Sequence, residues 1–192
     1  QLCSCAPTLN AKLYAGSQTF DEARHVEVFN HYLQKRIGVM YPINVNLKSI
    51  IDKILTDPRW DMKFIGMQIV IEGLALSAFN TTRETTPDPV LKDIVYLVTR
   101  DEARHVTFGV NYLEEFIKTL SDEEKEERAN FAYQACAISR ERLVATDVFQ
   151  KFGWDVEATR LKVLDGFVMS TFRNLLFQRV IPNLSRIGLL TN

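Results

Sequence analysis

The sequence DEARHV occurs twice, 80 residues apart, and the two copies hold two of the chain's three histidines. Each copy contains Glu-x-x-His, and on an α-helix residues i and i+3 lie about one turn apart on the same face. Glu22 and His25 can therefore bind one metal ion together. The second copy repeats this pair as Glu102 and His105. Such a motif on each of two helices, with one Glu from each of two others, holds two iron or manganese ions inside four-helix bundles.

A single carboxylate in an apolar helix provides the next expected ligand. Glu72 lies within GMQIVIEGLALSAF, where an unpaired carboxylate would be strongly destabilising unless a metal ion or another partner compensates it. One Glu-x-x-His alone is weak evidence, since it more often marks a solvated helix face. Two copies with Glu72 between them favour a dimetal site over a structural duplication whose polar groups only pair with one another.

The aspartate and arginine of each copy are expected to support the histidines. A metal-bound imidazole usually donates its other N–H to a carboxylate. We expect these bonds to cross between copies, so that the aspartate of one copy serves the histidine of the other and the arginines neutralise the aspartates. His31 points away from the face of His25 and is expected to be no ligand. The supporting residues are Asp21, Arg24, Asp101 and Arg104.

The hydrophobic pattern predicts an all-α protein, because apolar residues recur at three and four while Gly and Pro fall between long periodic segments. The first long helix is expected from about residue 7 to residue 36, ending at Gly38, and a short helix follows around LKSIIDKIL. Asp57 with Pro58 should begin a second long helix, with NTTRETTPDP as a loop after it. Asp88 with Pro89 should begin a third.

The last third of the chain is expected to add further helices. Ser121 and Glu124 form a capping box that should begin a fourth long helix. Gly153 is expected to separate it from a last helix that runs from about Asp155 to Pro182.

Composition narrows the class of protein. The 23 basic and 24 acidic residues give a formal net charge of −1, so no large basic surface for nucleic acid is expected. Three cysteines without a CxxC pair favour a reducing compartment. No apolar run reaches the ~18 residues of a membrane span, and the first residues lack a signal-peptide pattern. We expect one cytoplasmic domain over residues 1–192, with no nucleic-acid or membrane partner.

The helix turns beside the ligands predict a mostly apolar pocket next to the metals, and an apolar substrate. Gly109, one turn after His105, would leave room for a ligand there. Ordinary core packing is the alternative for each aromatic residue. The predicted lining residues are Phe29, Gln68, Leu76, Phe79, Phe108 and Gly109.

The doubled DEARH and the segment IEGLALSAF resemble the ferritin-like superfamily of diiron-carboxylate proteins. This superfamily includes acyl-carrier-protein desaturases, ribonucleotide reductase small subunits and N-oxygenase-like oxidases. The resemblance covers residues 1 to about 120, and RVIPNLSRIGLL is similar to the C-terminal helices of oxidase-like members. It implies a ferritin-like four-helix bundle core with additional C-terminal helices, which binds O2 between two irons. Mn or a mixed Fe/Mn pair stays open, because affinity order alone does not select the metal.

Three positions depart from named branches of that superfamily. Phe29 occupies the position of the tyrosine in radical-generating reductase subunits, so no tyrosyl radical is expected there. Ala75 and Leu76 lie where desaturases and multicomponent monooxygenases carry a threonine. No histidine follows His105, whereas N-oxygenases use a later one.

The sixth ligand implied by the resemblance is missing. Glu72 precedes Glu102 by 30 residues, so a symmetric partner of Glu22 would lie eight or nine residues before Gln1, and residues 1–20 contain no Asp or Glu. We expect the sequence to begin near the end of the first bundle helix, with QLCSC as its last turn. The alternatives are an open metal position or a ligand from another subunit. A groove left by the missing helix would favour a homodimer.

The expected function is O2-dependent hydroxylation, desaturation or N-oxygenation of a small, apolar organic substrate by a diiron oxidoreductase, with electrons from a donor protein. The alternative is a ferritin-like helical protein without catalytic activity, either metal-binding in iron handling or a metal-free interaction module.

Overall fold

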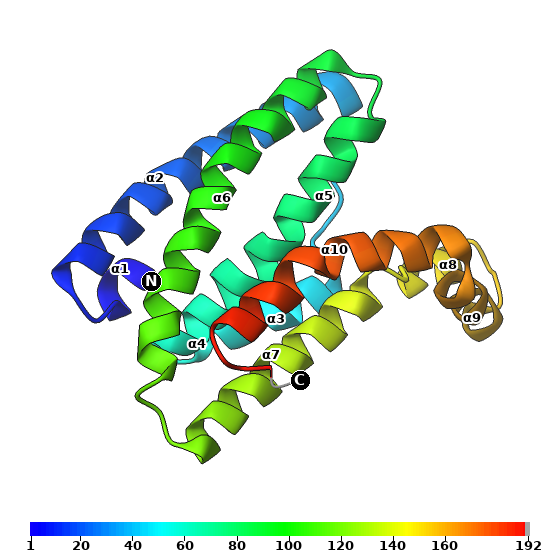
Figure 1. Cartoon of the computed structure of the whole chain (residues 1–192). Coiled ribbons are helices and arrows are strands. Elements are labelled where there is room, and N and C mark those ends of the chain that lie inside the picture. Colours follow the sequence, from blue (N-terminus) through cyan, green and yellow to red (C-terminus); the bar gives the residue numbers. More distant parts are fainter. Residues whose placement is uncertain (191–192) are drawn as a thin grey trace.

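The computed structural model describes residues 1–190, which are all-helical and contain no strand (Figure 1). The all-α prediction is therefore confirmed for this part of the chain. In chain order the elements are α1 (Leu2–Cys5), α2 (Leu9–Tyr32), the π-helical turn η1 (Leu33–Ile37), α3 (Val45–Thr56), α4 (Trp60–Phe64), the π-helical segment η2 (Ile65–Ile71), α5 (Glu72–Thr85), α6 (Pro89–Ile117), α7 (Asp122–Arg142), α8 (Thr146–Lys151), α9 (Val156–Asp165) and α10 (Phe167–Arg186).

Several helix ends follow the signals in the sequence. The chain leaves α2 and η1 at Gly38, whose φ of 76° is readily adopted only by glycine. Asp88 caps α6 by accepting a hydrogen bond from the Val90 amide, with Pro89 at the first helical position. The capping box of Ser121 and Glu124 begins α7 as predicted.

The segments α4, η2 and α5 form one helix over Trp60–Thr85, and both predicted ends were wrong. Arg59, with extended backbone, and not Asp57 stands at the N-cap, so the helix begins at Trp60, and the Asp57 carboxylate binds the amide and the guanidinium of Arg59. The helix also continues through most of the predicted loop 80–89. Helical threonines there, such as Thr81, bond their hydroxyls to carbonyls four residues earlier, and only residues 86–88 form the connection.

The single predicted last helix was also wrong. An additional short helix, α8, precedes Gly153, and extended backbone at Gly166 separates α9 from α10. Pro182 lies inside α10 and does not end it, because a proline removes only one amide donor and the helix runs one further turn to Arg186.

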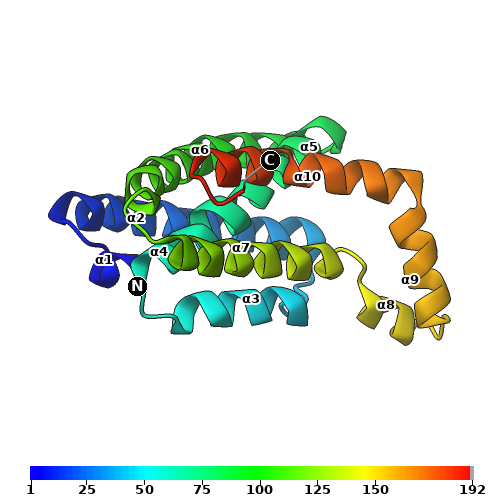
Figure 2. The same ribbon diagram turned by 60° about the horizontal axis from the view of Figure 1, so that its bottom comes forward.

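Helix α5 lies between α6 and α10 and packs against both, while α7 packs on α3 and η2 (Figures 1 and 2). Helices α2 and α6 run antiparallel along one side (Figure 1). The pair α8 and α9 projects from one end (Figure 2). The main core is formed mostly by aliphatic residues of α3, η2, α5, α6, α7 and α10, among them Ile54, Ile69, Leu113 and Val180, together with Phe64 of α4. This arrangement directs one face of the Trp60–Thr85 helix toward the α2–α6 pair.

The Trp60–Thr85 helix contains an 18-residue window with a mean hydropathy of 1.4, long and apolar enough to cross a membrane. Judged by length and composition alone, this helix contradicts the prediction that no apolar segment is long enough to span a membrane. However, 72% of that window is buried inside the protein. A buried core helix passes the same test, so this window is weak evidence for a membrane span.

Candidate metal centre

The two DEARHV copies face each other across the α2–α6 pair. Helix α2 carries Glu22 and His25, and α6 carries Glu102 and His105 at the corresponding positions. Contacts between Thr8 and Tyr112 at one end and between Tyr32 and Asp88 at the other show that the helices are antiparallel. An identical motif on two antiparallel helices produces an approximate two-fold arrangement of its side chains.

The carboxylates of Glu22 and Glu102 each lie close to the imidazole rings of both His25 and His105. The Nδ1 atom of His25 lies 3.3 Å from Glu102 Oε1 and 3.6 Å from Glu22 Oε2. The Nδ1 atom of His105 lies 3.3 Å from Glu102 Oε2 and 3.4 Å from Glu22 Oε1. Glu22 and Glu102 thus present one oxygen to each ring, which is how bridging ligands of two metal ions would be arranged.

The outer nitrogens of the rings make the predicted crossed contacts. His25 Nε2 lies 3.2 Å from Asp101 Oδ2, and His105 Nε2 lies 3.2 Å from Asp21 Oδ2. The two arginines of the motif each contact both aspartates, with Arg24 at 3.0 Å from Asp101 and Arg104 at 3.3 Å from Asp21. These contacts fix the ring orientations and leave both Nδ1 atoms directed toward the carboxylates.

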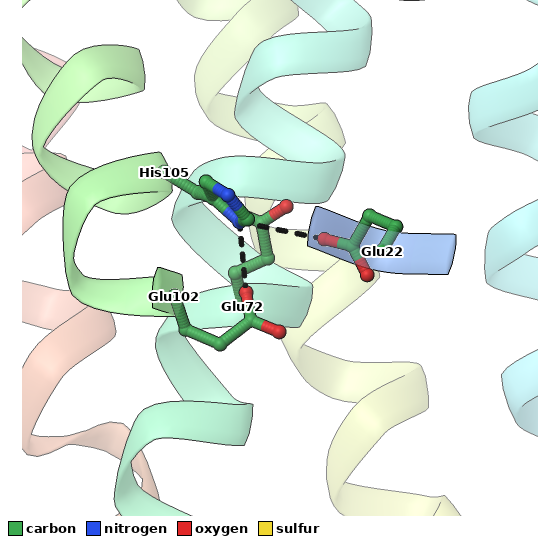
Figure 3. Close-up of side chains that lie close together, drawn as sticks. All are labelled: Glu22, Glu72, Glu102 and His105. Carbon is green, nitrogen blue, oxygen red and sulfur yellow. Dashed lines mark hydrogen bonds and ion pairs between the residues drawn. The ribbon is translucent and has the colours of Figure 1, made fainter. Parts of the chain in front are cut away.

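Glu72 joins this group from the Trp60–Thr85 helix. It follows η2 directly, and π-helical insertions of this kind are frequent at functional sites. The ligand atoms of Glu22, Glu72, Glu102 and His105 all lie within 4.8 Å of one another. Figure 3 shows these four side chains, which extend from three helices toward a common centre. His25 lies on the other side of the two bridging carboxylates, with its ring centroid 6.2 Å from that of His105.

Glu72 is 4% exposed and is only partly satisfied by protein groups. Gln18 Nε2 donates to its Oε1 at 2.7 Å, whereas its Oε2 has no hydrogen-bond partner among the described residues. Gln68 in turn donates to Gln18 at 3.2 Å. Burial and the nearby Glu102 carboxylate raise the pKa of Glu72 well above its usual value. A cation at this position would favour the ionised carboxylate and so lower the pKa of Glu72.

Contacts between the histidines and the glutamates also shift the pKa values of His25, His105 and Glu22. Burial alone would lower the pKa of His25 and His105, but contacts with Glu102 and Glu22 outweigh it and raise the pKa of each to about 10. Burial would raise the pKa of Glu22, but contacts with His105 and His25 lower it to about 2. Without a metal ion, the protonated rings of His25 and His105 therefore supply the positive charge between the carboxylates.

The donor set fits divalent transition-metal ions. Imidazole nitrogen and carboxylate oxygen are common ligands of iron and manganese. One buried atom facing the group, Glu72 Oε2, makes no hydrogen bond in the described part of the chain. Native proteins seldom leave such an atom unsatisfied, and a bound metal ion would give it a partner. The supporting contacts at His25 and His105 are those that metal-binding histidines usually make.

One side of the cluster is open. The Glu22 side chain is 45% exposed, whereas the Glu102 side chain is 8% exposed. A cavity of about 240 Å³ borders Glu22 and Glu72 on this side, with Leu2, Gln18 and Met67 in its wall. No further carboxylate joins the four clustered residues within the described chain. Gln18 was not predicted as part of the site. It lies one turn before Glu22 on the same helix face, and that spacing was its only signal in the sequence.

Most of the residues predicted to line a substrate pocket pack against other side chains. The Cβ of an alanine at Gly109 would lie 2.4 Å from Gln68 Cβ, so Gly109 makes room for Gln68 and not for a ligand. Leu76 is buried in the core. Phe108 stacks on Tyr14 at 3.8 Å between ring centroids.

The two other predicted pocket residues form a pair. Phe29 and Phe79 stack with their ring centroids 5.6 Å apart, and Phe79 also lines a separate cavity on the other side of α5. His31 is exposed and is not part of the metal group, as predicted.

Comparisons with protein-family models, with curated proteins and with solved structures found no match to this chain.

Proposed function

We propose that this protein is a ferritin-like diiron-carboxylate oxidoreductase that activates O2 and oxidises a small organic substrate. The observation that carries the proposal is the two-fold arrangement of Glu22 and Glu102, each of which presents one oxygen to each histidine Nδ1. A purely structural ion-pair network has no need for both carboxylates to span the same two nitrogens.

The ligands divide between two positions. His25 with one oxygen each of Glu22 and Glu102 would hold the first ion. His105 with the other two oxygens and with Glu72 would hold the second. Two ferrous ions bound there would supply electrons for the reduction of O2. Mn or a mixed Fe/Mn pair would use the same ligands.

The surrounding residues would keep this set of ligands ready for metal. Asp21 and Asp101 hold the outer imidazole nitrogens, and Arg24 and Arg104 balance the charge of both aspartates. Within the described cluster, the arginines contact the two aspartates and none of the three glutamates, Glu22, Glu72 and Glu102. Two divalent cations would replace the imidazolium protons and hold Glu72 in its ionised form despite its burial.

The remaining parts of the proposal follow from the resemblance. We infer that α2, the Trp60–Thr85 helix and α6 belong to a ferritin-like four-helix bundle, supported by their joint contribution to the ligand group. A cytoplasmic homodimer that receives electrons from a donor protein stays a prediction.

The test is anaerobic loading with Fe(II), followed by iron analysis of the desalted protein and optical spectra after exposure to O2. We expect two irons per chain and a new oxo-bridged absorption band. Glu102→Ala should abolish loading, whereas the control Glu115→Ala should retain it, because the Glu115 side chain is 78% exposed on the same helix. Many irons per chain would indicate an iron store, and none an interaction module. Equal loading of the Glu102→Ala variant would refute the assignment of the ligands.

A further inference from the structure

A second cavity lies apart from the metal cluster, among α3, α5, α7 and α10. Its volume is about 330 Å³, at the lower end of the roughly 300–1,000 Å³ of small-molecule sites. The walls are aliphatic and aromatic, and none of the five metal-site residues lines it. Residues that represent each wall are Ile51, Leu74, Ala78, Phe79, Phe172 and Leu176.

Ser139 is the first of two polar groups that α7 contributes to this apolar cavity. It is 3% exposed, and its hydroxyl has no hydrogen-bond partner among the described residues. A serine within a helix can bond to the carbonyl four residues earlier. Thr81, Thr99 and Thr107 do so in their helices, whereas Ser139 does not. Its hydroxyl is a buried donor without an acceptor at the wall of a cavity.

Arg142 is the second polar group, three residues later on the same face of α7. Within residues 1–190 its guanidinium makes no hydrogen bond or ion pair, and burial lowers its pKa. The other partly or fully buried arginine of α7, Arg128, binds Asp61 at 2.9 Å. Arg142 therefore offers an unused, partly desolvated positive charge at the edge of an apolar space.

We propose that this cavity binds a carboxylate that carries a straight apolar chain. The Ser139 hydroxyl would donate one hydrogen bond to the carboxylate, and the Arg142 fork would donate two. The chain would lie against the aliphatic and aromatic wall, which contains no other charged group. This site is separate from the metal cluster, and the proposal does not rest on the proposed oxidoreductase function.

Isothermal titration of the full chain, freed of metal with EDTA, tests the site with decanoate as the probe and 1-decanol as its uncharged counterpart. We expect one decanoate per chain and at least tenfold weaker binding of decanol. Arg142→Gln should weaken decanoate binding by about 10- to 100-fold, because it removes a charge-assisted pair. Ser139→Ala should weaken it less, and Ala78→Leu should abolish it by filling the cavity.

Two controls separate the site from general effects. Arg140→Gln changes an arginine of the same helix whose side chain is 55% exposed, and it should bind decanoate as the unaltered chain does. Glu102→Ala, which should abolish metal loading, should also leave decanoate binding unchanged. Equal affinity for decanoate and decanol, or undiminished binding by both Arg142→Gln and Ala78→Leu, would overturn the proposal. The decanol comparison and Ala78→Leu decide the matter even if Arg142→Gln fails to fold.

Discussion

Replacement of Glu72 by glutamine should make the metal-free protein more stable and its metal site weaker. The side chain is 4% exposed, its Oε2 has no partner among the described residues, and burial raises its pKa well above the usual value. Glutamine has nearly the same shape, and its carbonyl can still accept the 2.7 Å hydrogen bond from Gln18. The substitution therefore removes an ionisable group from an apolar site without creating a cavity.

The upper limit of this gain is that of a Glu72 side chain that keeps its proton in the folded state. Its unfolded pKa is 4.5, and each pH unit above that value costs about 1.4 kcal/mol for a retained proton. The upper limit at pH 7.5 is therefore about 4 kcal/mol, and about 0.7 kcal/mol at pH 5. Because the folded pKa is raised, this penalty is absent below the unfolded pKa and grows as the pH rises. We expect Glu72→Gln to gain about 1–3 kcal/mol at pH 7.5 and less than 1 kcal/mol at pH 5.

Urea unfolding of the EDTA-treated proteins at both pH values measures this gain. Added Mn(II), which is stable in air, should then stabilise the unaltered chain more than the variant, because ligands that bind only the folded state add stability in proportion to their affinity. Glu84→Gln, at an exposed position of the same helix, should change neither quantity. A loss of stability at pH 7.5, or a gain that does not depend on pH, would refute the reasoning.

Two further predictions concern the metal-free cluster and its packing. Loading with Mn(II) at pH 8 should release about two to three protons per chain, because metal binding displaces a proton from each of His25 and His105, whose pKa values are about 10, and also the proton that buried Glu72 retains. Titration calorimetry in two buffers of different ionisation enthalpy counts them, and a release of fewer than two would contradict the imidazolium assignment. Gly109→Ala should destabilise the protein by about 1–3 kcal/mol in urea unfolding, because the new Cβ would lie 2.4 Å from that of Gln68. Gly16→Ala, with nothing within 4 Å, should instead be neutral or gain up to about 1 kcal/mol, and equal effects at both positions would contradict the packing argument.

The ligand group was predictable because helical spacing fixes which side chains share a face. Glu22 with His25 and Glu102 with His105 follow from that rule alone, and the shared motif sequence added the crossed aspartates. Helix starts with a complete local signal were also predictable. Where the same signal met a competing local contact, as at Asp57 with Arg59, the prediction failed.

The pocket could not be predicted, because spacing gives the face of a helix but not what fills the space opposite it. Gly109 lies on the expected face, yet Gln68 from the neighbouring helix occupies the room that it leaves. Gln18 was missed for a related reason. A buried amide that donates to Glu72 has no distinguishing signal in the sequence beyond its spacing of four residues from Glu22. The surroundings of Gly109 and of Gln18 both depend on contacts between helices, which a single sequence does not reveal.

The two halves of the cluster differ although their sequences are identical. Glu22 and Glu102 occupy the same place in the repeat, but their side chains are 45% and 8% exposed. Glu72 approaches from the side of His105 and completes the four-residue group there, while no third carboxylate of the described chain completes the set at His25. The repeat thus builds a two-fold pair of carboxylates, Glu22 and Glu102, inside an asymmetric surrounding. The Trp60–Thr85 helix, and not the repeated motif, makes the surroundings of His25 and His105 chemically different.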